Sequence, residues 1–219
     1  MSDVLVISPL GVEALAVRSA RRGLRVHSTG MGPYRARAAV PALLADPAAA
    51  LLIVGFGGGL ASDSQLCDVV VADRVVEVGE DGRPIGDPIA CAAAEQLARL
   101  LAARGLRACG GTVASVQEIV TGRGRERMLA SGAVAVDMES AWVAAAARER
   151  PFAVVRVLSD TPRHELRRRL PVGPPLPSAA NAARAIATLR RVAIALGHGG
   201  RGGELHTVLG VDAGERGQV

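Results

Sequence analysis

The sequence has few aromatic residues for its length. Of its 219 residues, only Trp142, Tyr34, Phe56 and Phe152 are aromatic. Proteins that bind single-stranded nucleic acid stack the bases on exposed aromatic side chains. The net charge of +5 would suit such a partner, but most arginines are scattered along the chain. The one dense cluster, Arg163–Arg169, follows Asp160 directly and could contact an anionic substrate or an anionic lipid surface. The composition therefore argues against nucleic acid as the partner.

Cysteines and long hydrophobic runs are also scarce. The three cysteines, Cys67, Cys91 and Cys109, are odd in number and lack a metal-ligand spacing, which predicts no metal site and a reduced, cytoplasmic protein. We expect no signal peptide, because the N-terminus lacks a basic segment followed by a long apolar core. The apolar run Ala48–Val54 has the length of a strand, whereas a membrane span needs about 20 residues. We expect no integral membrane segment and, at most, peripheral contact with an anionic membrane surface.

The sequence does contain a regular alternation of short β-branched runs with stretches rich in Ala, Leu and Arg. This pattern predicts an α/β protein with a largely parallel sheet flanked by helices. The predicted strands are Val4–Ser8, Leu24–Thr29, Ala50–Val54, Val69–Val78, Ala108–Ser115, Ala133–Asp137 and Phe152–Leu158. The predicted helices are Gly11–Arg22, Tyr34–Asp46, Pro88–Arg104, Gly124–Ala130, Glu139–Arg148 and Ser178–Leu196. The longest predicted loops are Gly79–Asp87 and Pro162–Pro177.

We expect one domain and a tail. Hydrophobic residues make up 49% of the sequence, which suffices for one sizeable core over residues 1–196. Residues 197–219 begin with a glycine-rich stretch whose composition is typical of a flexible linker. The alternative is that Leu205–Gly210 docks on the domain as an extra strand.

Two short acidic islands in apolar surroundings are the strongest functional signal. Residues Ala135–Ser140 contain Glu139, and Val154–Thr161 contain Asp160, each where a predicted buried strand has just ended. Ligands of parallel α/β sheets bind at the carboxyl ends of the strands, so two neighbouring strands would aim both acids into one cleft. The alternatives are that Glu139 caps its own helix and that Asp160 pairs with Arg156 or Arg163.

Two glycine-rich turns and one further acid accompany the islands. The loop Gly55–Gly59 does not open a helix, so it is not a dinucleotide fingerprint, but its free backbone amides suit an anion or a sugar oxygen. Thr29–Arg37 is a second glycine turn that leads into a helix, with Arg35 available to an anion. Glu13 lies in the first turn of a predicted helix, where it either complements the helix dipole or reaches the cleft.

In this order along the chain, these features resemble the purine nucleoside phosphorylase and nucleosidase superfamily. The sequence is most similar to the branch that contains methylthioadenosine/S-adenosylhomocysteine nucleosidase and futalosine hydrolase. The segments that carry the resemblance are Glu13, the Gly-Met-Gly turn at Gly30–Gly32, Gly55–Leu60, Gly111–Ser115, Val136–Ala141 and Arg156–Asp160. The resemblance implies a three-layer α/β/α sandwich around a twisted, partly closed mixed β-sheet. It also implies a homo-oligomer, a dimer or larger.

The resemblance assigns roles to the acids. It implies that Glu139 accepts hydrogen bonds from the ribose hydroxyls beside Met138, and that Asp160, oriented by Ser159, protonates a purine, which we expect to be adenine. The Val120 backbone would read the base edge, and Glu13 would activate the attacking water. Phosphate remains an alternative nucleophile, and its candidate ligands are Gly32, Arg35 and Gly55. No cofactor is implied apart from phosphate as a co-substrate.

Three departures from the family concern the surroundings of the substrate. Phe56, beside Gly57 and Gly58, replaces a hydroxyl side chain, and Ile119 replaces the aromatic residue that stacks on the purine. The segment Val78–Asp87 is too short to enclose the 5′ group, which suggests a bulky 5′ substituent. A similar shortening occurs in the hopanoid-associated branch, which is thought to act on adenosylhopane in hopanoid biosynthesis. The competing hypothesis is a non-catalytic nucleoside-binding protein of the same fold.

Overall fold

The computed structural model describes residues 4–21, 23–147, 150–166, 177–197 and 204–211. Within them, eight strands form one mixed sheet, in which β2-β1-β3-β7-β6-β4-β5 follow one another and β8 pairs with both β3 and β4. The strands are β1 (Val4–Ile7), β2 (Arg25–His27), β3 (Ala50–Gly59), β4 (Val69–Val78), β5 (Pro84–Ala90), β6 (Ala108–Ser115), β7 (Ala135–Asp137) and β8 (Phe152–Asp160).

The sheet closes on itself over part of its width. Strand β8 runs parallel to β3 and antiparallel to β4, β4 pairs with β6, β6 with β7, and β7 returns to β3 as an antiparallel pair. These contacts form a ring of five strands, while β1 and β2 extend the sheet on one side and β5 on the other. The predicted partly closed mixed sheet is therefore confirmed.

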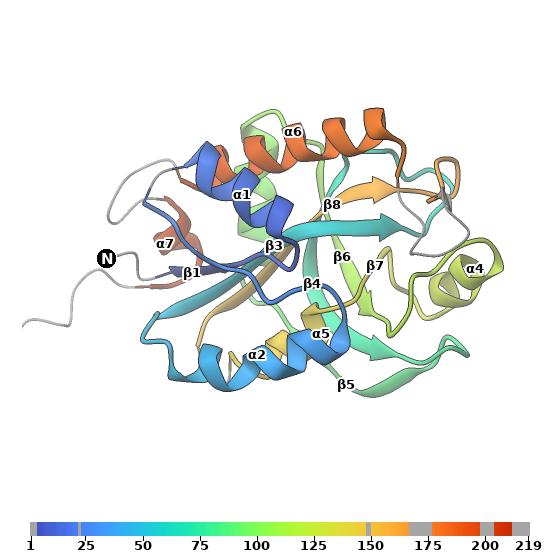
Figure 1. Ribbon diagram of the computed structural model, residues 1–219, viewed down its shortest axis with the longest axis horizontal. Helices are drawn as coiled ribbons and strands as arrows, with labels where there is room; N and C mark the ends of the chain where they lie inside the picture. Colours follow the sequence, from blue (N-terminus) through green and yellow to red (C-terminus); the bar gives the residue numbers. More distant parts are fainter. Residues whose placement is uncertain (1–3, 22, 148–149, 167–176, 198–203, 212–219) are drawn as a thin grey trace, which may run out of the picture.

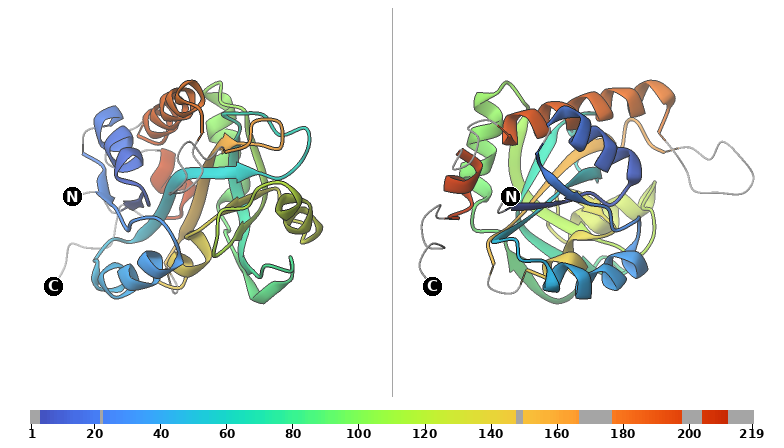
Figure 2. Two further views of the ribbon diagram at one scale, coloured as in Figure 1. Left: turned by 45° about the vertical axis from the view of Figure 1, so that its right-hand side comes forward. Right: turned by 60° about the vertical axis from the view of Figure 1, so that its left-hand side comes forward.

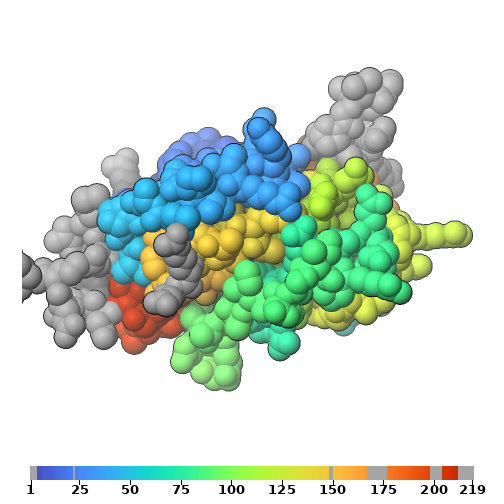
Figure 3. All heavy atoms as spheres, turned by 90° about the horizontal axis from the view of Figure 1, so that it is seen from below, coloured from blue at the N-terminus to red at the C-terminus, as the bar shows by residue number. Residues whose placement is uncertain are grey.

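Helices cover both faces of the sheet, and the two-residue alternation of each strand supplies both cores. On one face, α1 (Gly11–Ala20), α3 (Ala94–Ala103) and α6 (Ala179–Leu196) pack on side chains such as Val6 and Leu52. On the other, α2 (Pro33–Ala45) and α5 (Ser140–Ala144) pack on the intervening side chains. Figure 1 shows α1 and α6 above the sheet and α2 and α5 below it, and Figure 3 shows the lower face. The three-layer prediction is confirmed.

A third, smaller core lies at the carboxyl end of the strand ring. There α4 (Arg123–Ala130) buries Met128 against Val76, Val116 and Val136. This core supports the segment between β6 and β7, which approaches the pocket described below. The helix begins one residue before the predicted boundary, Gly124.

Two predicted loops contain paired strands. The segment Gly55–Gly59, predicted as a loop, continues β3 and pairs with β8 and β7. Residues 84–90, predicted as part of a loop and the start of a helix, form β5, and α3 begins only at Ala94. Every residue of β5 is exposed, so this edge strand lacks the alternation of buried and exposed residues by which strands are recognised in a sequence. Prolines are tolerated at such an edge.

The structure differs from the expected flexible tail at residues 204–211. Residues Glu204–Val208 form the short helix α7, and Leu205, Leu209 and Val211 are buried in the core that contains α3 and α6. Figure 2 shows α7 beside α3. The glycines thus precede a docked element that is a helix and not an extra strand. Residues 198–203 and 212–219 lie outside the described residues, as does most of the loop predicted at Pro162–Pro177. Among the helices that are described, none has the length and apolar character needed to cross a membrane.

Candidate active site

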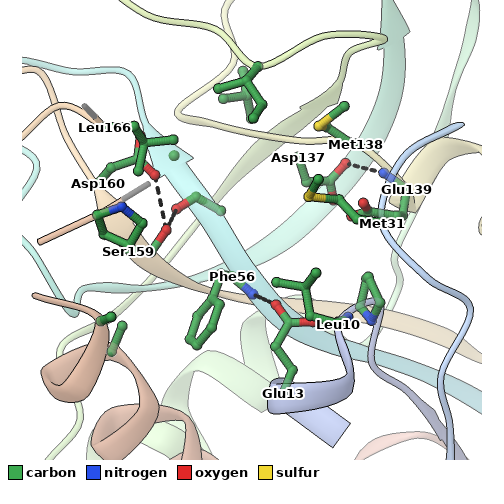
Figure 4. A pocket seen from close by; sticks show the side chains of 18 of the residues that line it. Leu10, Glu13, Met31, Phe56, Asp137, Met138, Glu139, Ser159, Asp160 and Leu166 are labelled. Carbon is green, nitrogen blue, oxygen red and sulfur yellow. Dashed lines mark hydrogen bonds between the residues drawn. The ribbon is translucent and has the colours of Figure 1, made fainter. Parts of the chain in front are cut away.

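A cavity of about 470 Å³ opens where β3, β7 and β8 end. Figure 4 shows Ser159 and Asp160 at one end, Met138 and Glu139 at the other, and Phe56 with Glu13 between them. All the residues predicted for catalysis or nucleoside binding line this pocket: Glu13, Phe56, Gly57, Gly58, Ile119, Val120, Met138, Glu139, Ser159 and Asp160. The structure therefore brings together residues that lie far apart in the sequence.

Gly58 is the point at which the two acidic islands meet. It pairs with Val136 of β7 on one side and with Asp160 of β8 on the other. The prediction that the two strands are neighbours is wrong, because β3 runs between them. The register shifts between Gly57 and Gly58, so Ser159 is the extra residue of a β-bulge. Bulges re-aim side chains beside active sites, and here both Ser159 and Asp160 face the pocket.

Glu13 reaches the pocket from the first turn of α1. Its carboxylate accepts hydrogen bonds from the Phe56 N–H and the Leu10 N–H, both at 2.6 Å. Burial raises the pKa of Glu13 to about 7, although Arg156 and the two N–H groups oppose this rise. Glu13 therefore titrates near neutral pH, as a general base requires. Of the two interpretations given above, the structure supports the one in which Glu13 reaches the cleft.

Glu139 lies at the end of the pocket opposite Asp160. Its Oε1 accepts a hydrogen bond from the Gly32 N–H at 2.9 Å, and its Oε2 lies 3.5 Å from Arg156 Nη2. Burial raises the pKa of Glu139, while Arg156 acts in the opposite direction. Glu139 does not cap its own helix, since its side chain bonds none of that helix's N–H groups. Asp137 takes this role, because its Oδ1 accepts from the N–H groups of Glu139 and Ser140.

Arg156 is a fully buried cation beneath the pocket. Its guanidinium lies 2.7 Å from Asp137 Oδ2 and donates to the Ser140 hydroxyl at 2.9 Å. Burial by itself would lower the pKa of Arg156, but Asp137, Glu139 and Glu13 together raise it, so the cation persists. Gly55 makes room for it: a Cβ there would lie 2.7 Å from Arg156 Nη1 and 2.9 Å from Glu13 Oε1. Arg156 thus offsets the negative charge of Glu13, Asp137 and Glu139 at this end of the pocket.

Asp160 is buried at the other end, but its partner is not one of the predicted arginines. Its Oδ2 forms an ion pair with Arg125 of α4, and its Oδ1 accepts a hydrogen bond from the Ser159 hydroxyl at 3.0 Å. Arg156 binds Asp137 instead, and Arg163 is exposed. Burial raises the pKa of Asp160, and the charge of Arg125 is the largest influence that lowers it. The net upward direction suits a carboxyl group that donates a proton.

The remaining wall of the pocket is mainly apolar. Leu10 and Val12 at the start of α1, Phe56 of β3 and Leu166 line it, together with Pro177, Ala179, Ala182, Ala185 and Ile186 at the start of α6. Val12 is 45% exposed at this opening. The polar groups of the pocket therefore gather at the ends of β3, β7 and β8. The apolar residues form a path toward solvent between α1 and α6.

The residues predicted to bind phosphate do not line this pocket. The Gly32 N–H is occupied by Glu139, Gly55 lies against Arg156 and Glu13, and exposed Arg35 lines a separate hollow that shares Leu10 and Met31 with the pocket. In the part of the chain that the structure describes, no group of three or more His, Cys, Asp or Glu side chains is placed to hold a metal ion.

Known proteins resemble this chain in sequence pattern and in fold. The family described as Phosphorylase superfamily matches residues 11–196. No curated protein matches the sequence. A mutant of the Helicobacter pylori 5′-methylthioadenosine/S-adenosylhomocysteine nucleosidase, solved with 5′-methylthioadenosine in its active site, is 17% identical, with a TM-score of 0.71 over 90% of this chain and 96% of that one.

Two further solved structures have the same fold. The nucleosidase of Neisseria meningitidis, in complex with methylthio-immucillin-A, is 18% identical, with a TM-score of 0.70 over 89% of this chain and 98% of that one. The futalosine hydrolase of Helicobacter pylori is 18% identical, with a TM-score of 0.67 over 88% of this chain and 94% of that one. Since the family match spans most of the chain and agrees with the observed fold, the protein belongs to the phosphorylase superfamily.

Proposed function

We propose that the protein cleaves the N-glycosidic bond of a purine nucleoside that carries an apolar 5′ substituent. The observation that carries this proposal is the placement of three buried carboxylates, Glu13, Glu139 and Asp160, around one pocket. Each has different partners, so each suits a different task. Two nucleosidases that share the fold were solved with 5′-methylthioadenosine and with methylthio-immucillin-A, respectively.

Glu139 would hold the ribose. A carboxylate has about four acceptor positions. The backbone of Gly32 and Met138 and the charge of Arg156 use part of this capacity in Glu139, and the rest would serve the ribose hydroxyls. Met138 lies beside this position. Because Glu139 and Arg156 are rigidly buried, they would fix the sugar with its anomeric carbon between the other two acids.

Asp160 would act on the base as a general acid. When the C1′–N9 bond breaks, its electron pair passes to the purine, and a proton from Asp160 at N7 lets the base leave as a neutral molecule. The same carboxylate can accept a hydrogen bond from an exocyclic amine, which favours adenine. Ser159 keeps the carboxylate aimed into the pocket, while Ile119 and Val120 contact the purine plane and edge.

Glu13 would activate the nucleophile. As water attacks C1′, Glu13 takes one of its protons and the new C–O bond forms. Its pKa of about 7 matches this task. Water is favoured over phosphate because the candidate phosphate ligands do not line the pocket.

The apolar path between α1 and α6 would hold the 5′ substituent. Its residues offer no hydrogen-bonding side chains to a polar group, and Val12 at its mouth is exposed. A long apolar group could therefore leave the pocket toward solvent, or toward a membrane surface to which the basic protein is attracted. Adenosylhopane is a nucleoside of this kind and is our candidate substrate.

The test is release of free base from a panel of nucleosides, with and without phosphate. We expect adenine from 5′-alkyl adenosines, at rates that rise with the length of the apolar group and do not depend on phosphate. Equal rates with methylthioadenosine would contradict the lipid-like substituent, and a strict need for phosphate would make the protein a phosphorylase. Hypoxanthine release alone would contradict the preference for adenine.

The variant Asp160→Asn tests the assignment of the general acid. Loss of the proton donor should lower kcat about 10²- to 10⁴-fold, whereas binding of a non-cleavable nucleoside analogue, measured by calorimetry, should persist. Because this variant leaves Arg125 without its main partner, its unfolding must be measured in parallel. Wild-type turnover in the folded variant would refute the assignment, and no base release by the wild-type protein would favour a non-catalytic nucleoside-binding protein.

A further inference from the structure

Arg125 is a buried cation that the steps above do not use. It projects from α4, is only 3% exposed, and lies behind Asp160, outside the residues that line the pocket. Nothing in its sequence context, between Arg123 and Arg127, distinguishes it. Its neighbours in space do distinguish it, because they come from three other parts of the chain.

The guanidinium of Arg125 connects these parts. It donates to Asp160 Oδ2 from β8 and to the carbonyl oxygen of Gly59 from β3. Its Nε lies 3.3 Å from Glu165 Oε1 in the segment after β8, although the two do not form a hydrogen bond. Gly58 leaves space for the pair, since a Cβ there would lie 3.0 Å from Asp160 Oδ2 and 3.2 Å from Arg125 Nη1.

Glu165 extends this connection to the segment beside the base. Its Oε1 accepts a hydrogen bond from the Gly122 N–H at 2.7 Å, and Gly122 follows Ile119 and Val120 closely. The segment after β6 and the segment after β8 are thus joined at Glu165, and Arg125 joins both to the carboxylate of Asp160. A shift of Arg125 would therefore move the acid relative to the wall that contacts the purine.

We propose that Arg125 is a positioning residue for departure of the base and that it acts through Asp160. In this proposal, the negative charge of Glu165 partly offsets the effect of the positive charge of Arg125 on Asp160. This inference rests on the proposed function. Arg125, which does not line the pocket, binds Oδ2, whereas Oδ1 accepts a hydrogen bond from Ser159, which does line it; Oδ1 is therefore the oxygen that we assign to the purine. Arg125 does not touch the substrate and is not itself a catalytic residue.

The charges around Asp160 predict how this role would affect the pH dependence of base release. The groups that act on it are Arg125 from α4, Ser159 from β8 and Glu165 from the following segment; exposed Glu118 also lines the pocket but does not act on Asp160. The positive charge of Arg125 lowers the pKa of Asp160, whereas the negative charge of Glu165 raises it. Base release that needs a protonated Asp160 declines as the pH rises through this pKa, so the two residues shift the decline in opposite directions.

The experiment compares pH profiles of base release for the wild type, Arg125→Leu, Arg125→Lys and Glu165→Gln, with Arg127→Leu as the control on the exposed face of the same helix. For Arg125→Leu we expect a loss in kcat of about tenfold to a hundredfold from misplacement of the acid, with little change in KM. The decline at high pH should move upward in Arg125→Leu and downward in Glu165→Gln. Arg125→Lys should restore part of kcat, and Arg127→Leu should match the wild type.

The outcomes separate this role from the reaction itself. Identical pH profiles in Arg125→Leu, Glu165→Gln and an active wild type would overturn the role of Arg125 and leave the proposed function intact. If Arg125→Leu does not fold, the pH profiles of Glu165→Gln and Arg125→Lys test the role of Arg125. These two variants should fold, because neither leaves a buried charge without a partner. Absence of base release from the wild type would refute both proposals, since Arg125 would then have no reaction to serve.

Discussion

The contribution of Glu13 to the free energy of folding depends on pH. Its ordinary pKa of 4.5 rises to about 7 because the carboxylate is buried. A carboxyl group whose pKa is raised by folding favours the folded state below its ordinary pKa, and this contribution disappears as the pH rises through the raised value. The folded protein is therefore less stable when Glu13 carries the negative charge that the proposed reaction needs.

Replacement of Glu13 by Gln should make this cost measurable. Between pH 4.5 and a pH well above 7, the free energy of unfolding of the wild type should fall relative to that of Glu13→Gln by about 3 kcal/mol, as 2.5 pKa units imply. Urea unfolding of both proteins at pH 4.5, 6 and 8 measures the difference. A constant difference across this range would show that Glu13 does not titrate as proposed.

The two buried arginines differ in how far the sequence reveals them. Arg156 interrupts the apolar strand Phe152–Leu158, so it could have been recognised as a buried cation in need of acidic partners. Arg125 stands among other arginines in a polar helix, and only the fold shows that it faces Asp160. The role of Asp137 could not be predicted either, because the sequence spacing of Asp137 and Glu139 does not show which acid caps the helix and which faces the pocket.

Among the elements, β3 contributes most to the geometry of the site. Its glycines lie between β7 and β8, and the bulge at Ser159 turns two successive side chains toward the pocket. The sequence indicated a close approach of backbone and ligand at these glycines. It did not indicate that the neighbours would be other strands and the side chains of Arg156 and Arg125.

A methyl group at Gly58 should disturb this junction. In Gly58→Ala the new Cβ would lie 3.0 Å from Asp160 Oδ2 and 3.2 Å from Arg125 Nη1, so the ion pair must shift. We expect kcat to fall about tenfold or more and the free energy of unfolding to fall by about 1–3 kcal/mol. The matched control is Gly110→Ala in β6, where the nearest atom to the new Cβ is 4.0 Å away. Equal activity of the two variants would contradict the importance of this contact.

The helix α7 should contribute to stability and not to turnover. Leu205 is buried in the core that contains α3 and α6, and it is not among the residues that line the pocket. Leu205→Ala should lower the free energy of unfolding by about 2–5 kcal/mol, whereas Thr207→Ala on the exposed side of α7 should change it by less than about 0.5 kcal/mol. Thermal unfolding together with base release at a permissive temperature tests this. Loss of activity without loss of stability would contradict it.

For the whole molecule, the fold was more predictable than the substrate. Alternating strand and helix patterns and the ordered segments around Glu13, Gly55–Leu60, Glu139 and Asp160 sufficed for the fold class and for the pocket residues. Edge strand β5 and helix α7 were missed because the first buries nothing and the second follows a glycine-rich stretch. The apolar path between α1 and α6 depends on packing of distant segments, which local patterns do not encode.

The ring of strands also determines when the site can exist during folding. Gly58 meets Val136 and Asp160 only after segments from the first, middle and last thirds of the chain have paired. Closure of such long loops carries a large entropic cost and is slow compared with formation of local helices. A partly folded chain can therefore contain most of its helices and still lack the pocket around which its three acids are arranged. Activity belongs to the completed ring, and no fragment of the chain that lacks one of its strands can be expected to retain it.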